Sequence, residues 1–183
     1  MSPRRSEHNK KEKKNKYNSV NFEFIKIVVS APNVNEFSAS SSGSIQFENE
    51  IVNNEIKLKT SSSGSIIGNV NSKNVIIEAS SSGEIISKLK ADKVETKVSS
   101  AGEVTLSGTA TTAEIEASSS GDFKAKELDV INAFVSASSA SNIEFTVLET
   151  LDARSSSYGK IWYYGNPTKV SIETSSYGKI IKK

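Results

Sequence analysis

The sequence has no cysteine and only one histidine, His8, among its 183 residues. Without cysteine there are no disulfides and no thiolate metal sites, although both oxidising and reducing compartments remain compatible with the chain. Because His8 lies near the start of the chain, no Ser-His or Cys-His pair is expected within the folded body. The abundance of serine therefore does not indicate nucleophilic catalysis.

Long apolar runs and the common cofactor motifs are also missing. No apolar run reaches the roughly 18 residues that a membrane span needs, and no basic-then-apolar leader begins the chain. We find no glycine-rich phosphate loop, zinc-ligand spacing or EF-hand loop. We therefore expect no transmembrane segment, no signal peptide in this sequence and no cofactor.

What the sequence does contain is serine in a regular repeat. Eight times a Ser-Ser pair precedes a small-residue corner, at intervals of 18 to 21 residues. Such a period indicates one short structural unit stacked on copies of itself. The corners close at Gly43, Gly64, Gly83, Gly102, Gly121, Ser141, Gly159 and Gly178. Two residues before these corners lie Ser41, Ser62, Ser81, Ser100, Ser119, Ser139, Ser157 and Ser176.

Around each corner, apolar residues fall on alternate positions, which is typical of strands with one buried face. A third side of each repeat, which holds Val70, Leu89, Leu128 and Val147, contains all the variation in spacing. The second residue after the corner is apolar in every copy: Ile45, Ile66, Ile85, Val104, Phe123, Ile143, Ile161 and Ile180.

These repeats predict an all-β fold. Stacking strand on strand at about 4.8 Å aligns equivalent positions into columns. The expected architecture is a single-stranded parallel β-helix of roughly seven to eight coils with about 19 residues per coil, right-handed because parallel crossovers almost always are. In that fold Ile85, Val104 and Phe123 lie directly over one another in a common core.

The corners carry three further expectations. Glycine closes them because a sharp bend between strands often needs a positive φ, which glycine adopts without cost. Ser141, which replaces glycine in one copy, should relax or distort its corner. The serine two residues before each corner should point inward and find a backbone or serine partner, as a structural device rather than a ligand site.

The charge is divided between a basic tail and a mildly acidic body. Residues 1–18 carry seven Lys or Arg against two Glu, with almost no apolar residue. We expect residues 1–20 to be a disordered tail, and residues 21–183 to form a single β-helix domain. For the tail, a solvated leader or the remnant of an upstream region is favoured over a nucleic-acid or membrane-surface role, and we expect no nucleic-acid partner.

Outward positions suggest ion pairs and, less directly, a cation site. Five residues before the corner, charges of opposite sign alternate on successive repeats, which favours the correct register. One residue after the corner, Glu84, Glu103 and Asp122 stack three acids. They could hold Ca²⁺, but a solvated stripe relieved by Lys124 and Lys88 is favoured, because repeated units generate such rows.

Aromatic residues gather near the end of the chain. Such a cluster can stack on sugar rings or form a protein-contact patch, or it can cover the open end of a solenoid. Both interpretations stay open. The candidate binding residues are Tyr158, Trp162, Tyr164 and Tyr177.

Three segments stand out beside the recurring serine-rich corner: residues 27–32 (IVVSAP), residues 161–167 (IWYYGNP) and residues 175–180 (SSYGKI). Together with the corner, they resemble a known bacterial family, the "putative auto-transporter adhesin, head GIN domain" family. The resemblance covers about residues 22–181. It implies an extracytoplasmic or surface-exposed β-helical domain with an adhesive role and no attached catalytic residues. This chain departs from the family in its basic start and in its three-serine corners.

Two functions follow from these observations. The first is a non-enzymatic cell-surface module that binds a glycan or a protein. The alternative is a structural scaffold that polymerises end to end, as bactofilin-like β-helices do, and a small homo-oligomer also remains open. A carbohydrate-active enzyme is disfavoured because the four aspartates do not share a repeat position: Asp92, Asp122, Asp129 and Asp152.

Overall fold

The computed structural model describes residues 27–30 and 33–183. The predicted tail, residues 1–20, and its boundary with the following domain lie outside the described residues. The chain divides into two units, Met1–Pro32 and Asn33–Lys183. In the first unit the described residues 27–30 are exposed and form no strand. The fold described below is that of the second unit.

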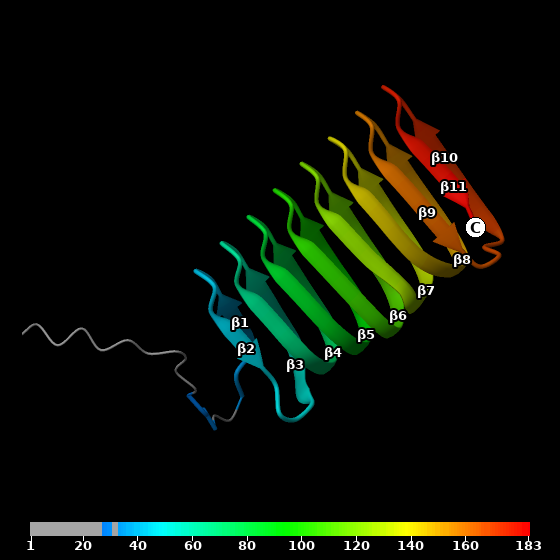
Figure 1. Ribbon diagram of the computed structural model, residues 1–183. Coiled ribbons are helices and arrows are strands. Elements are labelled where there is room, and N and C mark those ends of the chain that lie inside the picture. Colours follow the sequence, from blue (N-terminus) through cyan, green and yellow to red (C-terminus); the bar gives the residue numbers. More distant parts are fainter. Residues whose placement is uncertain (1–26, 31–32) are drawn as a thin grey trace, which may run out of the picture. The chain divides into compact units, whose positions relative to one another are not determined.

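The second unit is a parallel β-solenoid of about 8 turns with ~19 residues per turn, and the described residues contain no helix (Figure 1). Strands pair in the order β1-β3-β4-β5-β6-β7-β8-β9-β11, while β2 pairs with β4 and β10 with β8. The bounds are β1 (Glu36–Ala39), β2 (Ser44–Gln46), β3 (Ile51–Thr60), β4 (Ser65–Ala79), β5 (Glu84–Val98), β6 (Glu103–Ala117), β7 (Asp122–Ala137), β8 (Asn142–Ser155), β9 (Lys160–Tyr164), β10 (Lys169–Thr174) and β11 (Lys179–Lys182).

The core consists of columns that run along the stack, as the sequence predicts. Ile85 pairs with Val104, and Val104 with Phe123, and each is at most 1% exposed. The third side contributes its own buried residues, including Leu89 and Leu128. The shifts in register also lie on the third side, for example between Ala125 and Asp129. The coils therefore absorb differences in length without disturbing the columns that flank the corner.

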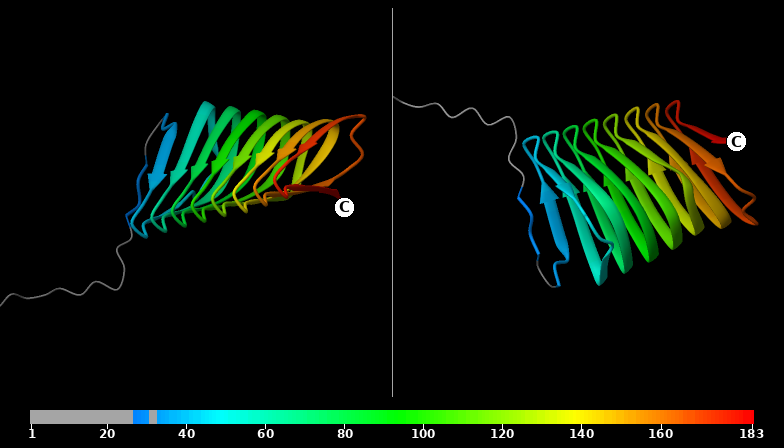
Figure 2. Two further views of the ribbon diagram at one scale, coloured as in Figure 1. Left: turned by 90° about the horizontal axis from the view of Figure 1, so that it is seen from above. Right: turned by 60° about the horizontal axis from the view of Figure 1, so that its bottom comes forward.

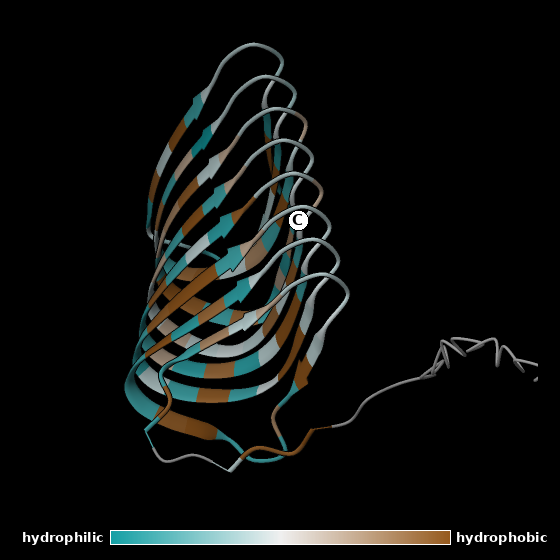
Figure 3. Cartoon of the chain, turned by 90° about the vertical axis from the view of Figure 1, so that its left-hand side faces the viewer, coloured by the Kyte–Doolittle hydropathy of each residue, from teal (hydrophilic) through white to brown (hydrophobic). Residues whose placement is uncertain are grey.

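The corners protrude at one edge of the stack, opposite the rounded third side (Figure 2, Figure 3). In the second corner φ is +49° at Ser62 and +60° at Ser63, and the N–H of Gly64 donates to the Ser61 carbonyl at 2.9 Å. Two successive left-handed residues closed by this hydrogen bond are the pattern of a type I′ turn. No corner glycine in the described residues has a positive φ, so the prediction that glycine supplies it is wrong.

Glycine is needed at the corner for a different reason, which is the close approach of the preceding coil. A Cβ added to Gly64 would lie 2.3 Å from the Ala39 carbonyl oxygen, and one added to Gly102 would lie 2.6 Å from that of Ala79. Backbone hydrogen bonds hold the coils at this spacing, such as the 2.9 Å bond from the Glu84 N–H to the Gly64 carbonyl. A side chain at this position therefore meets backbone that cannot move aside cheaply.

The serine two residues before the corner points outward, which corrects a second expectation. Its left-handed backbone lies in the protruding turn, and the side chain is exposed in the described copies: Ser41, Ser62, Ser81, Ser100, Ser119, Ser139, Ser157 and Ser176. These serines are linked along the stack by main-chain hydrogen bonds. From the second corner onward, the serine carbonyl accepts an N–H from the preceding corner, as from Ser63 to Ser81 at 3.1 Å.

The corner closed by Ser141 is only slightly relaxed. Its φ values are +50° at Ser139 and +59° at Ala140, which match the glycine corners. The closing hydrogen bond from Ser141 to Ser138 is 3.1 Å long, compared with 2.8–2.9 Å in the other copies. The backbone of the turn therefore tolerates this serine without distortion.

Candidate functional site

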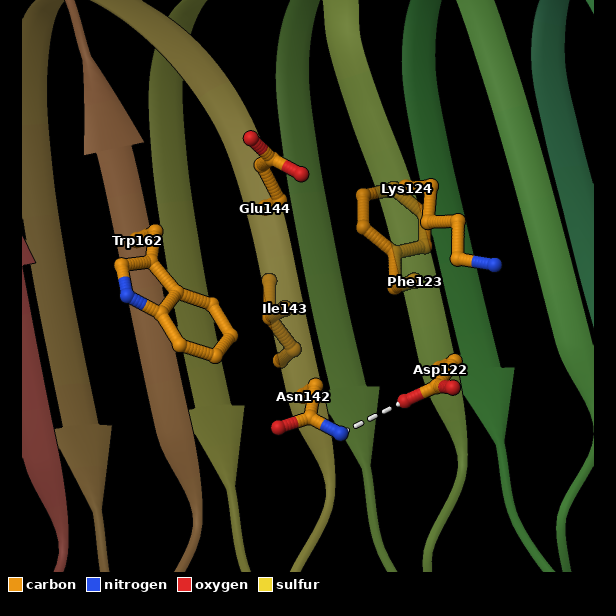
Figure 4. A pocket seen from close by; sticks show the side chains of 7 residues that line it. All are labelled: Asp122, Phe123, Lys124, Asn142, Ile143, Glu144 and Trp162. Carbon is orange, nitrogen blue, oxygen red and sulfur yellow. Dashed lines mark hydrogen bonds between the residues drawn. The ribbon is translucent and has the colours of Figure 1, made fainter. Parts of the chain in front are cut away.

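The candidate site is a shallow groove on the face formed by the strands that follow the corners. Residues one, three and five positions after each corner point outward from this face, because side chains alternate along a strand. Near the C-terminal end, Trp162 lies beside Glu144 in the neighbouring coil, and Glu144 beside Lys124. With Asp122 and Asn142 they line a groove of about 200 Å³, whose floor is formed by Phe123 and Ile143 (Figure 4).

Hydrogen bonds between coils hold the polar side chains of the groove in place. The Asn142 amide donates to the Asp122 carboxylate at 2.8 Å, and the Tyr164 hydroxyl donates to Glu144 at 2.6 Å. The latter bond raises the pKa of the Tyr164 phenol, since the neutral form is the donor. Each carboxylate keeps a second oxygen that these bonds do not use.

The two basic residues of this region are engaged in different ways. Lys124 pairs with Glu103 at 2.6 Å, and this hydrogen bond raises the pKa of the lysine. The Lys126 ammonium lies 4.9 Å from the centre of the Tyr164 ring, in a cation–π contact. Within the described part of the chain, the Trp162 indole has neither a hydrogen bond nor a ring partner. The indole is therefore the aromatic side chain that the groove itself offers to a ligand.

The four predicted aromatic residues form two separate pairs. Trp162 and Tyr164 lie in β9 on the groove face. Tyr158 and Tyr177 lie in the last two corners, where their rings stack 5.1 Å apart at an interplanar angle of 9°. Both corner tyrosines are exposed and have left-handed backbone. The neighbouring Tyr163 belongs to the core, so only part of the aromatic cluster is available at the surface.

The acidic row lies in register beside the groove but does not form a metal centre. Glu84 pairs in the sheet with Glu103, and Glu103 with Asp122. Of the three, Glu103 is neutralised by Lys124 and Asp122 accepts from Asn142. No group of three His, Cys, Asp or Glu placed to hold a metal is found among residues 27–30 and 33–183. The arrangement matches a solvated stripe, although Lys88 forms no ion pair with it in the described residues.

The alternating charges five residues before the corner do form ion pairs between coils. Lys59 lies 3.4 Å from Glu78, and Lys97 lies 3.4 Å from Glu116. These pairs confirm the predicted register of the stack. They are exposed, so solvent screening makes their contribution to stability small.

Sequence analysis missed the polar residues around Trp162. Asn142 and Glu144 come from the preceding repeat, and Lys124 was considered only as a partner of the acidic row. Their positions could have identified them, because Glu144 and Lys124 stand three residues after a corner, as Trp162 does, and Asn142 stands one residue after a corner. A second groove, of about 590 Å³, follows the bend of the third side, where Lys73, Lys90 and Asp92 are among its lining residues. It was not anticipated either.

Comparison with known proteins supports the fold and the family. A solved structure named "Crystal structure of Putative lipid binding protein from Parabacteroides distasonis ATCC 8503" is 25% identical, with a TM-score of 0.73 over 82% of this chain. This chain covers 62% of the length of that protein. Curated proteins give no significant match. Among the described residues, no helix is long and apolar enough to cross a membrane.

The family profile described as "Putative auto-transporter adhesin, head GIN domain" matches residues 5–88 and 69–167. These two segments overlap and together span most of the chain. As its corners and closing motif predict, the chain belongs to this family.

Proposed function

We propose that this chain is a non-enzymatic adhesion module, displayed outside the cytoplasm, which binds a carbohydrate on a partner surface through the groove around Trp162. The observation that carries this proposal is an indole, without a hydrogen bond or ring partner in the described residues, in one groove with two carboxylates and an amide. Aromatic rings with a few well-placed polar groups are typical of sites that orient a small ligand. The family description, an adhesin head, supports the extracytoplasmic location.

The chemistry of the lining favours a ligand rich in hydroxyl groups. Asp122 and Glu144 each offer a carboxylate oxygen that is not used by the hydrogen bonds of the groove, and the Asn142 amide offers its carbonyl. These acceptors suit the donor hydroxyls of a sugar, whose apolar ring face can lie against the indole. Because the side chains already hold one another, little conformational freedom is lost on binding.

No Ser-His or Cys-His pair is available in the body of the sequence for acyl transfer, since the single histidine is His8. The charge of the groove disfavours nucleic acid as the partner, because the groove carries two carboxylates and its lysine, Lys124, is already paired with Glu103.

A glycan array and a cell-binding assay with the full chain test the proposal. We expect Trp162→Ala to lower the affinity at least about tenfold, which corresponds to 1.4 kcal/mol. Tyr177→Ala is the matched control, because it removes an aromatic ring that is 76% exposed but lies outside the groove. Both variants should keep the wild-type far-UV circular dichroism spectrum and melting temperature.

Three results would overturn the proposal. Loss of binding in Tyr177→Ala but not in Trp162→Ala would assign the site to the corner tyrosines. Binding to phosphatidylcholine vesicles without binding to any glycan would replace the carbohydrate by a lipid ligand, in line with the lipid-binding name of the solved relative. Release of shortened glycans, followed by mass spectrometry, would make the protein an enzyme.

A further inference from the structure

The last coil of the solenoid leaves core-facing side chains uncovered. Val170 and Ile172 of β10 pair in register with Leu151 and Ala153 of β8. The β8 residues are at most 1% exposed, whereas Val170 is 49% and Ile172 is 44% exposed. These β10 side chains occupy core positions of the repeat, but no further coil covers them in the described structure. Apolar surface of this kind often marks an interaction site.

The backbone at both ends of the stack also has unused hydrogen-bonding groups. Among the described residues, β10 pairs only with β8 and β11 only with β9, while β1 pairs only with β3 and β2 only with β4. Within residues 33–183, no strand therefore pairs with the outer edges of β10 and β11 or with those of β1 and β2. Such edges are ready templates for another strand.

The two ends match because they are copies of the same repeat. If the register of the interior coils continued from one molecule to the next, Ile172 would lie over Phe37 and Ile180 over Ile45. Interior coils make the same kind of apolar match, as Ile66 does with Ile85. Phe37 and Ile45 are only partly buried at the first coil, so both partners have apolar surface left to cover.

The charges of the first and the last coil are opposite. Residues 33–50, the first coil, contain three Glu and no Lys or Arg. Residues 165–183, the last coil, contain four Lys and one Glu. In the continued register Lys183 stands opposite Glu48, since each is the fifth residue after its corner. This pattern attracts unlike ends and repels like ends.

We propose that this chain assembles head to tail, with the last coil (residues 165–183) of one copy docked on the first coil (residues 33–50) of a second copy, so that the solenoid continues. The contact joins two different surfaces and does not close on itself, so it generates open filaments rather than dimers. Assembly would place Trp162 grooves at regular intervals and raise the avidity for a repetitive surface. The assembly does not depend on which ligand the groove binds.

Sedimentation velocity and negative-stain electron microscopy of the full chain test this proposal over a range of protein and salt concentrations. We expect the mass to rise with protein concentration, filaments one solenoid wide at low salt, and dissociation as salt screens the end charges. Ile172→Asp should shift the onset of assembly at least about tenfold higher in concentration. Ile86→Asp is the matched control, because Ile86 is 38% exposed on a lateral face of an interior coil.

Charge reversal provides a second test that leaves the core intact. One variant carries Lys179→Glu and Lys183→Glu, and the other carries Glu48→Lys and Glu50→Lys. Each should assemble poorly alone at low salt, and a mixture of the two should recover filaments. Strictly monomeric protein at all concentrations would overturn the proposal, as would a closed symmetric dimer, an equal loss of assembly in Ile86→Asp, or a mixture that recovers nothing.

Discussion

The hydroxyl of Ser141 donates a 2.9 Å hydrogen bond to the carbonyl oxygen of Ala117 in the preceding coil, and it accepts the N–H of Ser138 at 3.1 Å. The seven equivalent corner residues are glycine. One coil earlier, a Cβ added to Gly121 would lie only 2.7 Å from the Val98 carbonyl oxygen. Serine is tolerated in one corner because the turn opens slightly and the hydroxyl bonds to the carbonyl group that crowds the site.

Gly102→Ala should destabilise the protein by about 1–3 kcal/mol, because its methyl group would meet the Ala79 carbonyl without any compensating hydrogen bond. Ser141→Ala is the matched variant, since that corner already accommodates a Cβ. It loses both hydrogen bonds of the hydroxyl. Because the Ser138 N–H and the Ala117 carbonyl also bond to each other at 3.0 Å, the cost should be about 1 kcal/mol. Urea unfolding measures both. An unchanged midpoint for Gly102→Ala would show that the coils separate easily at the corners.

Ala101→Gly, one residue earlier, should have the opposite effect. Ala101 is exposed and has φ of +57°, a left-handed conformation that disfavours a Cβ. Glycine removes that strain, and we expect a gain of about 0.5–1 kcal/mol after its larger chain entropy is included. Ala110→Gly serves as the control, because Ala110 is buried in β6 and its loss should destabilise. A lower melting temperature for Ala101→Gly would contradict the assignment of strain to this residue.

The columns of the core could be predicted from sequence because two periods coincide. Alternation along each strand places Ile85, Val104 and Phe123 on one face, and the repeat interval then places them over one another. The conformation of the corner could not be predicted in this way. The requirement for Gly64 comes from the Ala39 carbonyl, a tertiary contact that exists only once two coils are stacked.

The candidate site was predictable only in part. Trp162 stood out because it is the single tryptophan, whereas Glu144 and Asn142 are ordinary polar residues until the register brings them beside it. The tyrosines were grouped by their closeness in sequence. Tyr158 and Tyr177 nevertheless stack apart from β9, because the residue before each corner glycine lies in the protruding turn.

Thr96→Val should stabilise the protein. Thr96 is 1% exposed, and its hydroxyl has no hydrogen-bond partner. It lies between Ile77 and Ile115 in an otherwise apolar column. Removing a buried, unpaired hydroxyl while keeping the shape should add about 1 kcal/mol. Thr109→Val is the control, because Thr109 is at an exposed position of β6, and it should change the free energy of unfolding little. A loss of stability in Thr96→Val would indicate that the Thr96 hydroxyl does have a hydrogen-bond partner.

Tyr164 should ionise only above the ordinary tyrosine pKa of about 10. The neutral phenol donates its hydrogen bond to Glu144, and ionisation would place a second negative charge beside that carboxylate, so the pKa of Tyr164 is raised. The stabilisation from this bond is therefore complete below the unfolded pKa and is lost as the pH rises through the raised folded value. Subtracting the tyrosinate absorbance titration of Tyr164→Phe from that of the wild type isolates this residue. In Glu144→Ala, the titration midpoint of Tyr164 should fall towards the ordinary tyrosine pKa. A midpoint at or below the ordinary pKa in the wild type would show that the hydrogen bond from Tyr164 to Glu144 does not form in solution.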